Sequence, residues 1–173
     1  MFIVRWLAAI LILPCTGVIG VPWVLLWLTR TPNWGDCFRS VSSPSIWAAG
    51  ILALSGLALA IWTCSFFFRF GEGTAAPWDP PKRFVVRGPY RHVRNPMIAG
   101  IFLILSAEVL LFSSLAILAW ECVFVLGNLL YIPLVEEKTL LRRFGAEYDL
   151  YRQHVPRWIP RLRAWKQDGP TDS

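Results

Sequence analysis

Four long apolar blocks, separated by polar connectors, dominate the hydropathy pattern of this 173-residue chain. They cover residues 2–28, 46–68, 97–112 and 115–135. An α-helix needs roughly 20 apolar residues to cross the hydrocarbon core of a bilayer. The first, second and fourth blocks are long enough for this, and the third is short. The pattern predicts an all-α membrane protein with about four transmembrane helices in a single domain, residues 1–173.

Each block also predicts some local structure. The first helix should kink or end early, because it contains the helix breakers Pro14, Gly17, Gly20 and Pro22. The second block is rich in small residues at spacings of about four, which allow helices to pack closely in lipid. Only Ser113 and Ser114 separate the last two blocks. These blocks should therefore form a tight antiparallel hairpin whose polar ends return to the same membrane face.

From residue 136 the spacing changes to that of an amphipathic helix. One face carries residues at helical intervals, namely Glu137, Leu140, Leu141, Phe144, Tyr148 and Tyr151. Basic residues fall elsewhere on the helix, which predicts a C-terminal interfacial helix with its cations toward the headgroups. Two prolines, Pro156 and Pro160, should end regular structure. Residues 167–173 are expected to be a disordered tail.

Positive charge is distributed unevenly between the connectors. Of the 17 Lys and Arg residues, six lie in 69–96 and eight in 136–173, whereas 29–45 holds only Arg30 and Arg39. The positive-inside rule therefore places the 69–96 loop and both termini in the cytoplasm. No nucleic-acid-binding module accompanies the basic charge. The expected partners are membrane lipids with anionic headgroups, and nucleic acid is not expected.

Candidate chemistry begins at the segment Gly88–Pro96, which reads GPYRHVRNP. Asn95 is well placed to cap the third helix, with Pro96 at its first position. Two interpretations remain open. These residues either start a helix while Arg91 and Arg94 face lipid phosphates, or the helix N-terminus and both arginines form an anion site for a carboxylate.

An acidic pair, Glu136 and Glu137, follows the fourth block. The pair either forms salt bridges, with Arg143 or Arg94 as candidate partners, or binds a diol, an amine or a cation. Carboxylates suit the hydroxyls of a ribose, as in dinucleotide sites. Because both ends of the hairpin reach one membrane face, Arg94 and Glu137 should lie within one ligand's length of each other.

Three polar residues lie inside the apolar blocks: Glu108, Glu121 and Asn128. Such groups are rare in membranes. The two glutamates are either protonated or paired to each other, and we expect their role to be structural. Asn128 either reaches a site or bonds across helices. The chain has two histidines and no CxxC, zinc spacing, phosphate loop or GxGxxG. A metal site and covalent catalysis are therefore disfavoured.

Two paired motifs carry a resemblance to a known family. They are GEGTAAPWDPPKRFVVRGPYRHVRNPMIAG and, after the hairpin, EEKTLLRRFGAEYDLYRQHVPRWIPR. Together they resemble the isoprenylcysteine carboxyl methyltransferase and phospholipid methyltransferase superfamily, in particular its bacterial members. The resemblance covers residues 69–161, and residues 1–68 match only in hydropathy. The motifs are specific for the superfamily and not for a substrate.

The resemblance implies S-adenosylmethionine as methyl donor, bound at the cytoplasmic face of a catalytic core over 69–166. The family's Arg-His-Pro turn falls on Arg94-Asn95-Pro96, with Asn in place of His, and Ile98 replaces an aromatic residue that often follows. The implied catalytic residues are Arg94 and Glu137. The implied donor-binding set is Gly88, Tyr90, Arg91, Arg94, Asn95, Pro96, Glu136, Glu137 and Tyr148, and no metal is implied.

The resulting hypothesis is an integral methyltransferase of the bacterial inner membrane, acting on a lipid-like or isoprenoid, amphiphilic small-molecule acceptor at O, N or S. Methyl transfer from a sulfonium needs a well-placed nucleophile and little else, so a missing triad or metal is no objection. Two alternatives stay open. One is an NADPH-dependent sterol-type reductase, and the other is a membrane protein of the same fold without catalysis, given Asn95 and Ile98.

Overall fold

The structure, a computed structural model, describes residues 15–30, 43–70 and 84–166. All regular structure in these ranges is helical: the π-helix η1 (Thr16–Gly20), α2 (Val21–Thr29), α4 (Pro44–Phe70), the 3-10 helix η2 (Gly88–Arg91), α5 (Pro96–Phe112), α6 (Leu115–Tyr131), the π-helix η3 (Ile132–Glu136) and α7 (Glu137–His154). The start of the first apolar block, residues 71–83 of the basic loop and the predicted tail lie outside the described residues.

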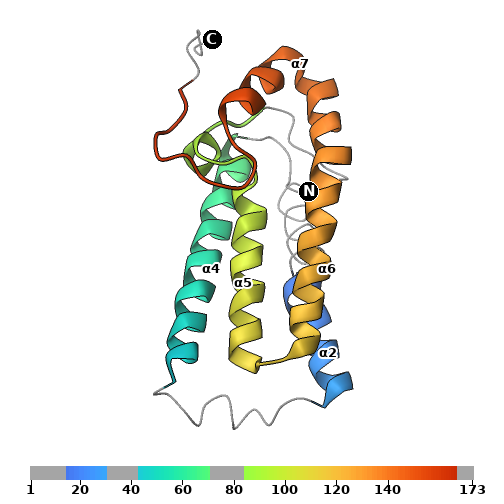
Figure 1. The fold of residues 1–173 in the computed structure, drawn as a ribbon. Helices are drawn as coiled ribbons and strands as arrows, with labels where there is room; N and C mark the ends of the chain where they lie inside the picture. The colour runs from blue at the N-terminus through green and yellow to red at the C-terminus, as the bar shows by residue number, and fades with distance from the viewer. Residues whose placement is uncertain (1–14, 31–42, 71–83, 167–173) are drawn as a thin grey trace.

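The helices form an elongated bundle with one elaborated end. The helices α4, α5 and α6 run side by side, α2 lies against α6, and α7 with the following segment covers the end where α5 begins (Figure 1). Two helical stretches are long and apolar enough to cross a membrane, the 27-residue Pro44–Phe70 and the 40-residue Leu115–His154. Two shorter apolar helices, Thr16–Thr29 and Pro96–Phe112, accompany them, where the sequence predicted about four spans.

Large apolar side chains cover the outside of the bundle. Trp27 is 75% exposed, Leu54 70% and Val123 61%. A soluble monomer rarely exposes continuous apolar surface. The apolar faces of α2, α4 and α6 therefore fit a hydrocarbon environment, as the hydropathy pattern predicted.

The tightest helix contact lies between α4 and α5, at two glycines. A Cβ atom on Gly56 would lie 2.6 Å from the backbone oxygen of Gly100, and one on Gly100 would lie 2.9 Å from that of Gly56. Small residues allow such backbone contact, which is how helices associate in lipid without a hydrophobic driving force. The small-residue pattern of the second block thus has a packing role against α5.

The first apolar helix is distorted where the sequence predicted a kink or an early end. In η1 the N–H of Val21 donates to the backbone oxygen of Thr16, a spacing of five residues. Pro22 has no N–H with which to continue this pattern onto Gly17. The indole of Trp120 on α6 supplies the missing bond instead, because its Nε1 donates to the Gly17 oxygen at 2.9 Å. The distortion therefore ties η1 to α6.

The predicted change of element at residue 136 takes a different form in the structure. Helix continues without a break from α6 through η3 into α7, because the extra residue of the π-turn accommodates Pro133. The chain bends later, at Gly145, whose φ of 54° and ψ of −128° are not helical. Figure 1 shows α7 turning over the end of the bundle. The predicted inner face of α7 does face inward, since Glu137, Tyr148 and Tyr151 are buried.

Intramembrane polar groups are partly satisfied within the bundle. Asn128 donates to the backbone oxygen of Phe124 on its own helix at 2.8 Å, so the expected bond across helices or into a site is not observed. Ser106 on α5 donates to Glu121 on α6. The Oε2 atom of Glu108 is buried without a hydrogen-bond partner among the described residues. The structure therefore links α5 and α6 through Ser106 and Glu121, which agrees with the structural role expected of the glutamates.

Candidate functional site

Three segments far apart in sequence meet at the elaborated end of the bundle. They are the turn 88–95, the first turns of α7 and the segment 155–165, which we call the C-terminal strap. The strap wraps around η2 (Figure 1). Its backbone runs antiparallel to the turn through three hydrogen bonds: Arg94 N–H to Pro156 O at 2.9 Å, Arg161 N–H to His92 O at 3.0 Å and Trp165 N–H to Arg91 O at 2.9 Å.

Gly88 sets the path of the chain into this turn. Its φ of +53° lies in the left-handed region that favours glycine. A Cβ atom here would also lie 2.4 Å from the ring of Phe66 on α4. Backbone geometry and packing both require glycine, so its position in the motif has a structural reason. Its predicted contact with a methyl donor stays a prediction.

A buried hydrogen bond fixes the turn against α7. Tyr90 is buried, and the hydroxyl of Tyr151 donates to its backbone oxygen at 2.7 Å. Burial raises the pKa of the Tyr90 hydroxyl well above its ordinary value, with the nearby Cys64, Tyr151 and Glu136 adding to the rise. Tyr90 is therefore a neutral hydroxyl group at physiological pH.

Glu137 lies at the centre of the site and binds two arginines. Its Oε1 accepts from Arg94 Nη1 at 2.9 Å and from Arg157 Nε at 2.7 Å. Its Oε2 accepts from Arg157 Nη2 at 2.9 Å. The expected proximity of Arg94 and Glu137 is thus a direct ion pair. Of the two partners that the sequence left open, the structure selects Arg94, and it adds Arg157.

This charge cluster is largely removed from solvent. The side chains of Arg94, Glu137 and Arg157 are 12%, 10% and 33% exposed. Buried charges are tolerated when they are paired and hydrogen-bonded. The hydrogen bond that Arg157 donates to Glu137 raises the pKa of Arg157. One polar atom is left over, because Arg94 Nε is buried without a hydrogen-bond partner in the part of the chain that the structure describes.

Tyr148 closes one side of the cluster. Its ring packs edge-on against Phe84, with centroids 5.7 Å apart. Burial, followed by the charge of Glu137, raises the pKa of Tyr148 to about 12, although Arg94 acts in the opposite direction through its charge and a hydrogen bond. Tyr148 therefore stays protonated and offers a hydroxyl beside the Arg94 guanidinium.

Glu136 has a different environment from its neighbour, beyond the apolar stretch 115–135. It makes no hydrogen bond or ion pair with the described residues. Burial, and then the negative charge of Glu137, raise the pKa of Glu136 above its ordinary value. The two glutamates are adjacent in sequence, yet only Glu137 is charge-compensated by arginine.

The remaining candidates hold the helix start and the strap. Asn95 precedes Pro96, the first residue of α5, but its side chain does not cap the helix. Its Nδ2 instead donates to the backbone oxygen of Arg157 at 3.3 Å. The Nε of Arg91 donates to the backbone oxygen of Trp165 at 2.7 Å. Both side chains thus bind the strap. Their predicted contacts with the methyl donor S-adenosylmethionine stay predictions.

Sequence reasoning gave Arg157 no role in the site. The residue lies between Pro156 and Pro160 in a segment without helical or strand periodicity, so no pattern indicates its partner. Its aromatic neighbour Trp158 stacks on Phe102 of α5, with centroids 5.5 Å apart. The sequence signal that could have indicated a segment packed against the bundle was a basic residue next to prolines and a tryptophan.

Comparison with known proteins identifies a family whose matched region includes part of this site. A family model described as phospholipid methyltransferase matches residues 44–147, which is more than half of the chain. The chain belongs to the phospholipid methyltransferase family. This confirms the resemblance to that superfamily of membrane methyltransferases. The family match spans α4 to the Gly145 bend, so it contains Arg94 and Glu137 and ends before Arg157.

Among curated proteins, this family member is similar to "Methanethiol S-methyltransferase 2" of Bradyrhizobium diazoefficiens strain USDA 110. The two are 37% identical over 78 residues, which cover 43% of the chain and 28% of the relative. The chain thus matches less than a third of that relative's length. No solved structure matches the chain.

Proposed function

We propose that this protein is an integral membrane methyltransferase that transfers the methyl group of S-adenosylmethionine to an amphiphilic small molecule. Family membership supports a methyltransferase. The observation that carries the proposal is the buried arginine–glutamate cluster beside the first turn of α5. Within the described ranges, Nε of Arg94 has no hydrogen-bond partner.

The residues present fit the chemical groups of this donor. Its carboxylate suits Arg94 Nε, a buried donor without a partner among the described residues. The start of α5, which lacks a side-chain cap, adds amide donors of the same polarity. The donor's ammonium and ribose hydroxyls suit a carboxylate such as Glu136. The aromatic residues Phe144 and Tyr148 offer apolar surface for the adenine.

When bound, S-adenosylmethionine supplies a methyl group already activated on a sulfonium. The chain's own task is then to bind, orient and exclude water. Arg94 orients the amino-acid end, and the cluster of Phe84, Tyr148 and Tyr151 excludes water beside it. Holding two reactants in line can supply much of the rate. A thiolate or carboxylate acceptor then needs no strong base.

The acceptor is proposed to be lipid-like or isoprenoid, methylated at O, N or S. Apolar side chains exposed along the bundle give such a molecule a lateral route from the bilayer. The printed name of the Bradyrhizobium relative favours a second candidate, a small thiol. Both acceptors share the need for a nucleophile next to the donor and differ in the apolar tail.

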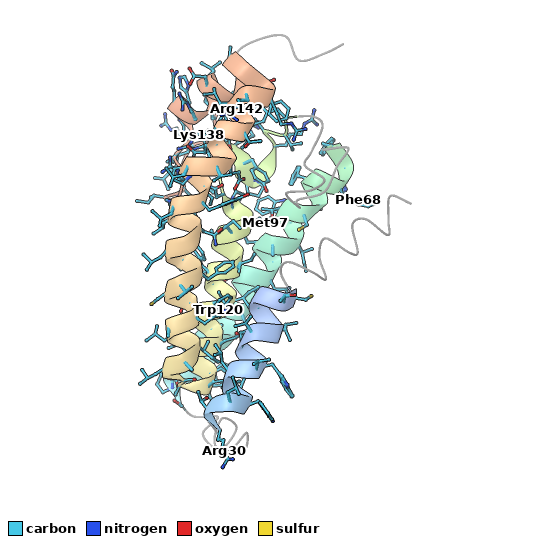
Figure 2. All side chains as sticks on the ribbon, turned by 90° about the vertical axis from the view of Figure 1, so that its right-hand side faces the viewer. Arg30, Phe68, Met97, Trp120, Lys138 and Arg142 are labelled. Atoms are coloured by element: carbon cyan, nitrogen blue, oxygen red, sulfur yellow. The ribbon has the colours of Figure 1, made fainter. Side chains whose placement is uncertain are left out.

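We further propose a bacterial inner-membrane location with the site on the cytoplasmic side. Lys138 and Arg142 stand at the end of the bundle that carries the site, and Arg30 stands at the opposite end (Figure 2). The positive-inside rule assigns the more basic end to the cytoplasm. Labelling of single cysteines introduced at Arg87 and at Arg30 tests this. Outer labelling of position 87 would overturn the topology.

Donor binding by purified protein is the primary test. Full-length protein in lipid nanodiscs should bind S-adenosylmethionine and not NADPH in a calorimetric titration. Binding of NADPH alone would favour the reductase alternative, and binding of neither would favour a protein without catalysis. Transfer of labelled methyl groups to phosphatidylethanolamine, an isoprenylated thiol or methanethiol then identifies the acceptor class.

A further inference from the structure

We infer that Arg157 is a positioning residue that acts through Glu137 to orient the guanidinium of Arg94. In this arrangement Glu137 is an internal anchor, and Glu136 is the carboxylate left for the donor's ammonium or ribose hydroxyls. The inference rests on the proposed function and assigns different tasks to two adjacent glutamates.

The bonding pattern at Glu137 is the first step. Arg157 uses Nε and Nη2 to bind both carboxylate oxygens, at 2.7 and 2.9 Å. Such a bidentate pair fixes the plane of the carboxylate as well as its position. Arg94 reaches the same carboxylate through Nη1 alone, at 2.9 Å. Arg94 Nη1 is thus held by Glu137, while Arg94 Nε has no hydrogen-bond partner among the described residues and is left for a ligand.

Arg157 and its neighbour Pro156 are hydrogen-bonded to the turn 88–95. Its backbone oxygen accepts from Asn95 Nδ2 at 3.3 Å. The preceding residue, Pro156, accepts from the backbone N–H of Arg94 at 2.9 Å. Backbone and side-chain bonds therefore form a closed ring through Arg94, Glu137, Arg157 and Pro156. A change at Arg157 is transmitted to Arg94 by two routes.

Glu136 precedes Glu137 and is rotated from it by about 100° around the helix. Among the described residues, the ion pairs of Arg94 and Arg157 are made with Glu137 and not with Glu136. Burial without a compensating partner disfavours ionised Glu136, whereas a cation or hydroxyl donor on a ligand would favour it. Glu137 has its charge compensated internally. The ligand-dependent carboxylate is therefore Glu136.

The test compares donor affinity with thermal stability in the same nanodisc samples. Arg157→Ala should weaken S-adenosylmethionine binding by about tenfold, and Arg157→Lys, which keeps the charge and loses the fork, by less. Arg152→Ala is the matched control, because Arg152 forms an exposed ion pair with Asp149 on its own helix and none with the residues of the site. Its donor affinity should equal that of the wild type.

A mutant cycle separates positioning from general support. In a Glu137→Gln background, Arg157→Ala should add little further loss of affinity, because its effect passes through Glu137. Glu136→Gln should weaken donor binding without lowering the unfolding temperature, whereas Glu137→Gln should lower both. If the loss of donor affinity in the double variant equalled the product of the two single losses, Arg157 would act independently of Glu137. That result would contradict the inference.

The outcomes distinguish the two proposals. Wild-type binding of S-adenosylmethionine with unchanged affinity in Arg157→Ala and Arg157→Lys would overturn this inference and leave the proposed function standing. An absence of binding by the wild type would overturn both. If Arg157→Ala does not fold, the comparison of Arg157→Lys with the wild type decides the question.

Discussion

The lipid-facing half and the site end of this molecule are held together by different chemistry. Between α4 and α5 the tightest contact is backbone against backbone, at Gly56 and Gly100. At the site end, long-range hydrogen bonds and a buried ion cluster join segments more than 60 residues apart in sequence, as in the bond from Tyr151 to Tyr90. One region depends on shape and the other on satisfied polar groups.

This difference follows from the two environments. Lipid provides no hydrophobic driving force for helix association, so close packing must supply the attraction. At the site end the charges are withdrawn from water, and each must find a partner. The helix pair therefore tolerates loss of a polar group but not added volume. The site end should tolerate small changes in volume but not an unpaired charge.

The largest effect should come from removing the central carboxylate. Glu137→Ala leaves Arg94 and Arg157 partly buried and unpaired, which should destabilise the protein by about 3–5 kcal/mol. Glu147→Ala, at an exposed position of the same helix, should have little effect. Thermal unfolding in nanodiscs, followed by circular dichroism, measures both. Equal stability of the two variants would mean that the site end does not depend on its ion cluster.

Added volume at the helix pair should come next. Gly56→Ala places a methyl group 2.6 Å from the Gly100 oxygen, and overpacking of this kind costs about 1–3 kcal/mol. Gly50→Ala is the control on the same helix, because a Cβ there meets nothing within 4 Å. The same unfolding assay applies. If Gly50→Ala were as harmful as Gly56→Ala, helix propensity and not shape would govern this region.

A smaller effect should follow loss of the bond that repairs the first helix. Trp120→Phe keeps an aromatic ring and removes the donor to the part-buried Gly17 carbonyl, at a cost of about 0.5–1.5 kcal/mol. Trp62→Phe, on the exposed face of α4, is the matched control. Hydrogen exchange of the α2 amides should rise in the Trp120 variant alone. Unchanged exchange of the α2 amides in this variant would show that the bond from Trp120 to Gly17 does not stabilise the first helix.

The smallest effect should be a pH-dependent gain in stability when Glu136 is replaced. The pKa of Glu136 is raised in the folded protein, so ionisation of this residue costs stability as the pH rises above about 4.3, the ordinary value of glutamate. Glu136→Gln should therefore raise the unfolding temperature at pH 7, and the gain should vanish near pH 4. Glu147→Gln should show no such gain. A loss of stability in the Glu136 variant at pH 7 would reverse the sign of this argument.

Much of the fold could be predicted from the apolar pattern. The blocks correspond to α4, α5 and α6, and helix α5 begins at Pro96 as expected from the preference of proline for the first helical position, although Asn95 makes no side-chain cap. The proximity of Arg94 and Glu137 followed from two apolar helices of 17 residues each, joined by two serines. These features depend on local spacing, which a single sequence displays directly.

Other features could not be predicted, for physical reasons. The strap pairs with the turn through backbone groups, which every residue carries, so no side-chain pattern marks the partner. Pro133 was counted within an apolar block, and a π-turn absorbs it without ending the helix. The bend at Gly145 preserves the inner face from Glu137 to Tyr151, so the helical spacing of the sequence does not reveal it.

The strap also determines when the site can exist during synthesis. Residues 88–137 leave the ribosome before Arg157, and until then Glu137 lacks two of its three hydrogen bonds. Arg91 and His92 gain their strap partners only when Trp165 and Arg161 have followed. The helices can enter the bilayer while the arginine–glutamate cluster is still open to water. Assembly of the site is therefore a late event in translation, separate in time from insertion into the membrane.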